Sequence, residues 1–179
     1  MNLSFQPLRE QDLPLMYRWL QEPHVREFYH PKEIPTWEET RKHYLERLVP
    51  DWPTKCFLSC CGGRPIGYIQ TYKVADYPEH AAVIGEADGI SIDLFIGDAE
   101  YIGKGWGRLI LVKFLNDVAF PLFPGEEVCW IYHEKANQRA LRASKAAGFQ
   151  YVRDIVEDGE LKELLMISRA TSGSRNPGP

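Results

Sequence analysis

The part of the sequence that most restricts the fold lies between residues 89 and 115. Residues 89–97 are apolar and β-branched, which predicts a strand, and an amphipathic helix is expected over residues 105–120. Three glycines, Gly103, Gly105 and Gly107, separate the two. Glycines at this spacing allow positive φ angles and let the backbone approach a ligand closely. A tight strand-to-helix turn without a ligand uses the same residues, so the glycines alone leave both interpretations open.

The chemistry that fits this loop is phosphate binding. Backbone N–H groups at the start of a helix, together with the helix dipole, bind anions, and Lys104 and Arg108 add charged donors. The sequence excludes two common nucleotide motifs. No Gly-Lys-Ser/Thr follows, so the segment is not a P-loop, and the glycines come too late in the chain for a Rossmann unit with its acidic ribose ligand.

Hydrophobic spacing and turn residues predict the remaining elements. Their order is β-α-α-β-β-β-α-β-α-β-β, which is a mixed α/β fold in one domain. Residues 1–170 are expected to form that domain, and residues 171–179 a disordered tail. The predicted elements are a strand over 3–8, a helix from Asp12 to Pro23, a short aromatic and charged stretch over 24–30, a helix from Thr36 to Pro50, a hairpin of 57–61 and 65–72, a polar loop over 76–88, a strand over 128–132, a helix over 137–147, and a hairpin of 149–156 and 161–167.

Charge and cysteine content limit the kinds of ligand and partner that the protein is expected to bind. The net charge is -4, which argues against nucleic acid and favours a cationic ligand. No cysteine pair has metal-ligand spacing, so no metal is expected, and buried free thiols suit a reducing cytoplasm. The chain shows neither a signal peptide nor a run of about 18 apolar residues, which predicts a cytoplasmic protein without membrane contact. The cysteines are Cys56, Cys60, Cys61 and Cys129.

A second segment, residues 137–149, identifies the family that the chain resembles. A helix opens at Asn137 after a short strand, and Asn137, Ala140 and Gly148-Phe149 are similar to a motif of the GNAT acetyltransferase superfamily. Gly105 and Gly107 match the glycines of its phosphate loop. The resemblance covers nearly the whole chain. It implies a mostly antiparallel sheet, splayed at the cofactor site and flanked by helices, with acetyl-CoA as cosubstrate.

The resemblance also implies which residues contact coenzyme A. The pantetheine arm is expected along the strand that ends at Gly97, and the diphosphate at the glycine loop. The implied contacts are Phe95, Ile96, Ile102, Gly103, Lys104, Gly105, Trp106, Gly107, Arg108, Asn137 and Arg139. Two positions differ from the family pattern. Ile102 replaces the usual Gln or Arg, although its main-chain N–H remains, and Ser144 replaces a Tyr that often protonates the leaving thiolate. Water or Tyr132 is the alternative source of that proton.

Within the superfamily, several runs are similar to the aminoglycoside 6′-N-acetyltransferases. They are residues 89–97 with 103–107, Trp19-Leu20 followed by His24-Val25, and residues 65–72. In that family an aspartate at the position of Asp93 lies in the acceptor site and helps to take the amine proton. An acidic residue at the position of Tyr132 also contacts the drug. The resemblance thus implies acceptor contacts at Asp93 and Tyr132. A polycationic sugar also needs several acidic groups and aromatic rings to stack on, and by that chemistry the further candidates are Glu86, Asp88, Glu134, Tyr72 and Trp37, with Asp76, Glu79, Tyr29, His24 and His30 beside them.

The chemistry of amines supports a role for Asp93. Amines are mostly protonated at pH 7 and must be neutral to attack a thioester. A carboxylate both binds the cation and accepts its proton. We therefore expect direct attack without an acyl-enzyme, and an oxyanion stabilised by a main-chain N–H between residues 94 and 96. The alternative is a structural Asp93 that bonds to local backbone.

Three other functions remain open from the sequence. A siderophore-pathway acyltransferase typically carries His where Asp93 stands. A peptide or protein amine is a different acceptor for the same chemistry. A non-catalytic CoA-binding sensor is consistent with Ser144 and Ile102. The expected partners are coenzyme A and a small cationic amine, and the expected state is a monomer or homodimer.

Overall fold

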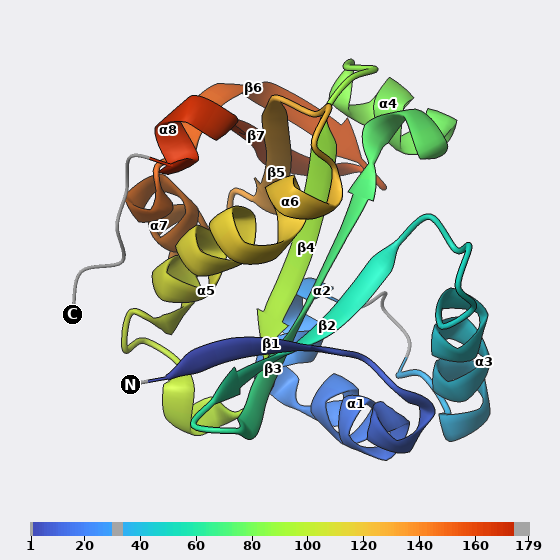
Figure 1. The fold of residues 1–179 in the computed structure, drawn as a ribbon. Helices are drawn as coiled ribbons and strands as arrows, with labels where there is room; N and C mark the ends of the chain where they lie inside the picture. Colours follow the sequence, from blue (N-terminus) through green and yellow to red (C-terminus); the bar gives the residue numbers. More distant parts are fainter. Residues whose placement is uncertain (1, 30–33, 174–179) are drawn as a thin grey trace. The chain divides into compact units, whose positions relative to one another are not determined.

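The computed structural model describes residues 2–29 and 34–173, which form two compact units. The first unit comprises Met1–Gln70 and Asp93–Ile102, and the second comprises Thr71–Ile92 and Gly103–Pro179. Two strands, β3 (Arg64–Lys73) and β4 (Ile90–Ile96), contain the boundaries and so contribute residues to both units (Figure 1). The assignment of residues 1–170 to one domain stays a prediction.

The described part of the chain contains seven strands, which hydrogen-bond in the order β1-β2-β3-β4-β5-β7-β6. The β4–β5 pair is parallel, and its ladder joins Ile90 with Cys129 and Ser91 with Trp130. The β1–β2, β5–β7 and β6–β7 pairs are antiparallel. This sheet with its helices confirms the predicted mixed α/β fold. The other strands are β1 (Leu3–Pro7), β2 (Lys55–Cys61), β5 (Val128–Glu134), β6 (Gln150–Glu157) and β7 (Glu160–Ser168).

Three α-helices belong to the first unit: α1 (Leu13–Gln21), α2 (Pro23–Tyr29) and α3 (Trp37–Arg47). The predicted capping box before α3 is present, because Thr36 accepts from the Glu39 amide and Glu39 accepts from the Thr36 amide. The aromatic and charged stretch over residues 24–30, which the sequence pattern assigns to no element, is helical from residue 23 to residue 29, and residue 30 lies outside the described residues. Pro23 ends α1 and also begins α2, because proline is pre-organised for the first helical turn.

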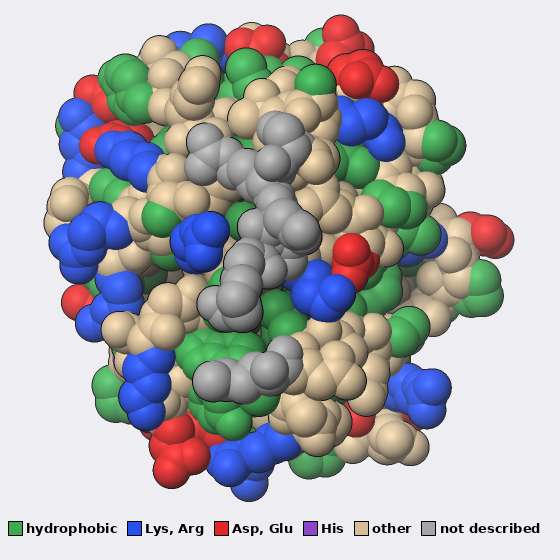
Figure 2. All heavy atoms as spheres, turned by 60° about the vertical axis from the view of Figure 1, so that its left-hand side comes forward, with side chains coloured by type: hydrophobic (Ala, Val, Ile, Leu, Met, Phe, Trp, Pro, Cys, Tyr) green, Lys and Arg blue, Asp and Glu red, His purple; other side chains and the backbone are tan. Residues whose placement is uncertain are grey.

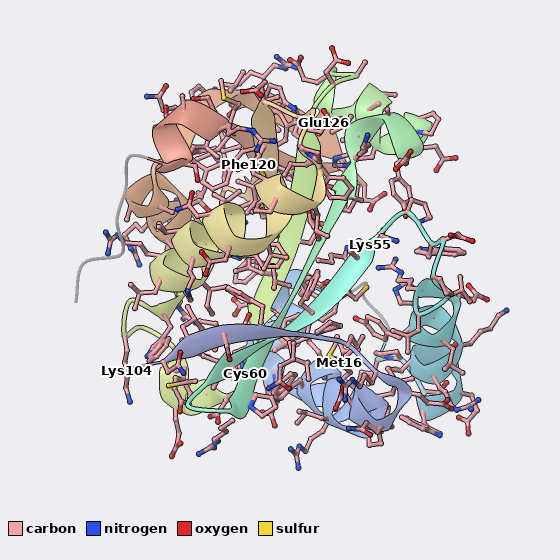
Figure 3. The ribbon with its side chains drawn as sticks, in the orientation of Figure 1. Met16, Lys55, Cys60, Lys104, Phe120 and Glu126 are labelled. Carbon is pink, nitrogen blue, oxygen red and sulfur yellow. The ribbon has the colours of Figure 1, made fainter. Side chains whose placement is uncertain are left out.

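The core of the first unit is formed by the apolar faces of these helices and of β2. Met16 and Cys60 lie within it, and Figure 3 labels both. Cys56, Cys60 and Cys129 are buried free thiols, as predicted, whereas Cys61 is partly exposed. The buried members of this core are Leu8, Leu13, Met16, Trp19, Leu20, Val25, Tyr44, Cys56, Leu58, Cys60, Tyr68 and Phe95.

The second unit has helices α4 (Pro78–Ile84), α5 (Trp106–Phe114), α6 (Phe120–Leu122), α7 (Gln138–Ala147) and α8 (Arg169–Gly173). The loop predicted over residues 76–88 is wrong, because α4 lies inside it. Pro78 starts α4 and Gly85 ends it in the left-handed conformation, while Ile84 is fully buried in a core with Val74 and Trp130. Burial of one apolar stripe therefore outweighs the polar composition.

The helix predicted over residues 105–120 has an interruption that the sequence does not indicate. A π-helical stretch, Leu115–Ala119, separates α5 from α6. Helix α8 extends to residue 173, and Ser172 is buried and donates to Asn116. Residues 171–173 of the predicted tail are therefore helical, and residues 174–179 lie outside the described part of the chain. No helix within the described ranges has the length and apolar content needed to cross a membrane.

Candidate active site

Asp93 lies half-buried in the apolar strand β4. Its Oδ2 oxygen accepts a hydrogen bond of 2.7 Å from the side-chain amide of Gln70 on β3. Within the described ranges, Oδ1 has no hydrogen-bond partner, and no backbone N–H donates to the carboxylate. The alternative of a structural aspartate bonded to local backbone is therefore not supported. Gln70 holds one carboxylate oxygen, and the other remains available to a hydrogen-bond donor.

Gln70 is the centre of a polar network that the sequence does not predict. Its Oε1 oxygen accepts from the Arg47 guanidinium at 2.7 Å and from the Tyr68 hydroxyl at 2.6 Å. The Tyr68 oxygen also lies 3.0 Å from the Cys56 sulfur. Gln70 and Tyr68 are buried, so these hydrogen bonds satisfy groups that have lost contact with water. Alternation along β3 places Tyr68 and Gln70 on one face, which is the only sequence signal for this network.

Aromatic rings pack beside this network in the first unit. Tyr29 contacts Phe95 with ring centroids 4.6 Å apart, and Tyr68 contacts both Tyr44 and Phe95 at 5.6 Å. Burial raises the pKa of Tyr29, Tyr44 and Tyr68 above the usual tyrosine range, so their hydroxyls remain protonated donors. The Phe95 side chain belongs to the core, so only its main chain is available for the predicted cofactor contact.

Other residues predicted for this region have partners inside the chain. Trp37 meets the ring of Tyr17 edge-on, with centroids 5.8 Å apart, and packs beside the core. His24 Nε2 lies 3.1 Å from the Ile96 carbonyl oxygen, a distance at which a protonated ring nitrogen donates to it. This bond places His24 next to the strand expected to hold the pantetheine arm. His30 lies outside the described residues.

Two glycines of the loop have left-handed backbone conformations. Gly103 and Gly105 have φ angles of 74° and 82°, and a Cβ atom at either position meets no atom within 4 Å. Conformation, not crowding, therefore makes glycine necessary here. Lys104 between them is exposed, and Figure 3 shows its side chain extending away from the ribbon. The Ile102 amide donates to the Ala99 carbonyl at 3.2 Å, so it already has an acceptor.

Helix α5 begins directly after this loop, at Trp106. Gly105 is its N-cap and supplies no side-chain cap. The first amides of a helix have no acceptor within the helix, so this end offers donors to an anion. Trp106 is buried, which limits its predicted cofactor contact to the main chain. A Cβ on Gly107 comes within 3.1 Å of the Ala143 Cβ, so Gly107 permits close packing of α5 on α7.

The residues of α5 and α7 that are predicted to contact coenzyme A differ in whether their side chains already have hydrogen-bond partners. Arg108 Nε donates to the Ala146 carbonyl at 3.3 Å, which ties its side chain to the end of α7. Asn137 caps α7, since its side-chain oxygen accepts from the Ala140 amide at 3.1 Å. Arg139 is exposed in the first turn of α7. Of the cations predicted to contact coenzyme A, Lys104 and Arg139 thus have exposed groups without a hydrogen-bond partner in the described ranges.

Ser144, at the position where the family usually has Tyr, is buried and paired. Its hydroxyl lies 2.7 Å from Nε2 of His133 on β5. Burial lowers the pKa of His133 from 6.5 to about 4, so its ring is neutral at pH 7. A neutral pair of this kind, with Ser144 buried and His133 partly buried, serves packing and hydrogen bonding. His133 was not among the predicted site residues, because a lone histidine on a strand carries no distinguishing pattern.

The two aromatic residues of the second unit that are predicted to contact the acceptor substrate share one neighbour. Tyr72 and Tyr132 both contact His80 of α4, with ring centroids 5.3 and 5.8 Å apart, and His80 Nε2 lies 2.7 Å from the Ser91 hydroxyl. His80 was missed because it belongs to the predicted loop. Tyr132 also donates to Glu157 at 2.8 Å.

The predicted acids of the second unit lie in separate local settings. Glu86 forms an ion pair of 2.8 Å with Arg153, and the main-chain oxygen of Asp88 accepts from the Trp130 indole. Glu134 ends β5 opposite Lys162 on β7. Asp76 lies in a 3-10 turn and Glu79 in the first turn of α4. The Glu86 carboxylate is therefore engaged within the chain, whereas the other four acids are placed here by their backbone alone.

Metal binding finds no support in the described ranges, where no three His, Cys, Asp or Glu side chains gather as ligands. On the face in Figure 2, Lys and Arg side chains are interspersed with Asp and Glu. This mixture agrees with the small net charge of -4.

Comparisons with known proteins give the family and the fold. The acetyltransferase (GNAT) domain family matches residues 9–156. Aminoglycoside N(6')-acetyltransferases type 1 from Klebsiella pneumoniae and Serratia marcescens are each 28% identical over 162 residues, covering 83% of this chain and 74% of theirs. The solved structure of AAC(6')-Ib with paromomycin and acetyl-CoA has a TM-score of 0.81 and 21% identity, covering 99% of this chain and 100% of that one.

Proposed function

This chain belongs to the GNAT acetyltransferase family, and we propose that it transfers the acetyl group of acetyl-CoA to a primary amine, the 6′-amine of an aminoglycoside. The names of the relatives from Klebsiella and Serratia support this acceptor. The observation that carries the proposal is the carboxylate of Asp93, which stands in an apolar strand with one oxygen anchored by Gln70. An ionised group in such a strand is costly unless function or a partner retains it.

Coenzyme A fits the loop that begins at Gly103. Its diphosphate needs several N–H donors and space for close approach, and the left-handed Gly103 and Gly105 with the start of α5 meet both needs. Lys104 adds a positive charge. We assign the diphosphate to the main-chain amides of residues 103–107, all in the second unit. Acetyl-CoA supplies the activated acetyl group when it is bound.

Asp93 acts on the amine. An ammonium group binds Oδ1 as a charged hydrogen-bond donor, and the carboxylate then accepts its proton, directly or through water, to leave a neutral nucleophile. Holding the amine at a fixed carboxylate also converts the encounter into an oriented one, which contributes much of the rate of such reactions. Ser144 and His133 take no part in this step, because Ser144 is buried and hydrogen-bonded to a neutral, partly buried His133.

The test uses two aminoglycosides that differ only in an amine or a hydroxyl at the 6′ carbon. With acetyl-CoA and purified protein, we expect release of free thiol with the amine and a rate lower by about 100-fold or more with the hydroxyl compound. Mass spectrometry locates the acetyl group on the product. Equal rates for the two compounds, or turnover restricted to peptide amines, contradict the 6′ assignment. Binding of acetyl-CoA without turnover of any amine indicates the sensor alternative.

A further inference from the structure

We infer that Arg47 and Tyr68 fix the orientation of the Gln70 side-chain amide and so hold Asp93 in place through a neutral donor. The inference rests on the proposed role of Asp93 as the group that binds and deprotonates the acceptor amine. It assigns Arg47, Tyr68 and Gln70 as positioning residues, since none of them needs to touch either substrate. All four residues belong to the first unit.

The hydrogen bonds have a direction that runs from Arg47 to Asp93. The Arg47 guanidinium can only donate, and Gln70 Oε1 accepts from it at 2.7 Å. The Tyr68 hydroxyl occupies the same oxygen at 2.6 Å. With its oxygen engaged on one side, the Gln70 amide presents Nε2 to Asp93 Oδ2 at 2.7 Å. The amide oxygen therefore faces hydrogen-bond donors, and the amide nitrogen faces a hydrogen-bond acceptor.

The opposite orientation of the amide is excluded by charge. A half-turn of the Gln70 amide places its oxygen against the Asp93 carboxylate and its NH2 group against the Arg47 guanidinium. Both contacts are then repulsive, and both lie at hydrogen-bond distance in a region with little water. Arg47 selects the productive orientation because a cation never accepts a hydrogen bond. Tyr68 is compatible with this orientation, because its protonated hydroxyl donates to the same Gln70 oxygen.

The amide also separates the cation from the carboxylate. A guanidinium in direct contact with Asp93 forms a bidentate ion pair and engages both carboxylate oxygens. With Gln70 between them, Asp93 receives one neutral hydrogen bond and keeps Oδ1 for the acceptor. No Asp or Glu in the described part of the chain forms an ion pair with Arg47. Its guanidinium is thus directed to the Gln70 amide oxygen.

The main test is a double-mutant cycle of Arg47→Met and Asp93→Asn. Arg47→Met keeps the length of the side chain and removes its charge and hydrogen bond. Alone, it is expected to lower kcat about 10-fold with a smaller change in the KM for acetyl-CoA. In the Asp93→Asn background it is expected to have almost no further effect, because its influence passes through Asp93. Arg47→Lys is expected to restore part of the lost kcat, since Lys also donates to an amide oxygen.

Two further variants separate positioning from folding. Gln70→Glu keeps the shape and gives Arg47 an ionic partner, but it turns a carboxylate oxygen toward Asp93, so we expect a loss of kcat of about 10-fold or more in a folded protein. Arg41→Met is the matched control, because Arg41 lies on the same helix α3 and forms an exposed ion pair with Glu10. Its turnover is expected to stay within about twofold of the unchanged protein.

The outcomes distinguish this inference from the proposed function. If Asp93→Asn abolishes turnover but Arg47→Met and Gln70→Glu leave kcat unchanged, the positioning network is wrong and the proposed function stands. If Arg47→Met lowers kcat by the same factor whether or not the Asp93→Asn substitution is present, Arg47 acts by another route and the inference is overturned. If Asp93→Asn itself leaves kcat intact, the proposed role of Asp93 fails first.

Discussion

The amide nitrogen of Gln70 on β3 lies 2.7 Å from the Oδ2 oxygen of Asp93 on β4. This hydrogen bond explains how a carboxylate is retained in an otherwise apolar strand, since a buried or half-buried charge needs a specific donor. It also fixes the side chain before any acceptor arrives. A group that is already oriented loses less entropy on binding and reacts more efficiently.

The left-handed conformation of Gly105 leads to a prediction about coenzyme A affinity. Gly105→Ala adds no steric clash, but an alanine at φ 82° is strained by about 1–2 kcal/mol. Relief of that strain moves the amides at the start of α5. We expect the Kd for coenzyme A, measured by calorimetry, to rise about 10-fold.

Gly159 provides the matched control for that experiment. It has φ 80° in the turn between β6 and β7, and an added Cβ again meets nothing within 4 Å. Gly159→Ala is therefore expected to cost similar stability while leaving the Kd for coenzyme A unchanged. An equal loss of affinity in both variants, or none in Gly105→Ala, contradicts the assignment of the diphosphate to this loop.

The N-cap of α7 allows capping and ligand binding by Asn137 to be told apart. Asn137→Ala is expected to lower the free energy of unfolding by about 1 kcal/mol, because the Ala140 amide loses its acceptor. Asn137→Asp keeps an oxygen acceptor and suits the positive end of the helix dipole, so stability is expected to be maintained. Denaturant unfolding measures both. If Asn137→Asp is as unstable as Asn137→Ala, the side chain does not act as a cap.

The second part of that experiment concerns the cofactor. If Asn137 only caps the helix, Asn137→Asp binds coenzyme A as tightly as the unchanged protein. A clear loss of affinity in Asn137→Asp, with stability retained, instead supports the direct cofactor contact that the family resemblance implies.

His133 predicts how stability depends on pH. Its pKa falls from 6.5 to about 4 on folding, because the folded protein buries the ring beside Ser144. Between these values the unfolded chain binds a proton that the folded chain does not, so stability decreases as the pH is lowered from 6.5 toward 4. The stability lost at pH 5 through this one group is roughly 1–2 kcal/mol.

His133→Gln tests this directly, because glutamine stays neutral and still reaches a hydroxyl. The free energy of unfolding of the variant, compared between pH 7 and pH 5, is expected to change less than that of the unchanged protein. An identical pH dependence in the two proteins means that His133 is not buried in its neutral form.

The order of elements was largely predictable from local signals. Thr36 with Glu39, the glycines of the loop, and Gly148 at the end of α7 mark boundaries that depend on neighbouring residues alone, and all are confirmed. Helix α4 was not predictable in the same way. Its residues lack a clear helical spacing of apolar side chains. The helix forms because Ile84 is buried among side chains that are distant in sequence.

The site was predictable only in part, for the same physical reason. Asp93 can be singled out from the sequence because a charged residue in an apolar strand is unusual. Gln70 and Arg47 were not, because their roles depend on three elements, β3, β4 and α3, that meet in the folded chain. The pairing of Glu86 with Arg153 likewise joins residues far apart in sequence, so a carboxylate that looks free in a loop proves to be engaged.

The most direct test of the role of Asp93 is the acetylation rate of Asp93→Asn with an aminoglycoside that carries a 6′-amine. Asparagine keeps the size and one oxygen but neither binds an ammonium ion as strongly nor accepts its proton. We predict that kcat falls about 100-fold or more while the Kd for coenzyme A stays within about twofold. Undiminished turnover by Asp93→Asn, in a folded protein that binds coenzyme A normally, contradicts that role.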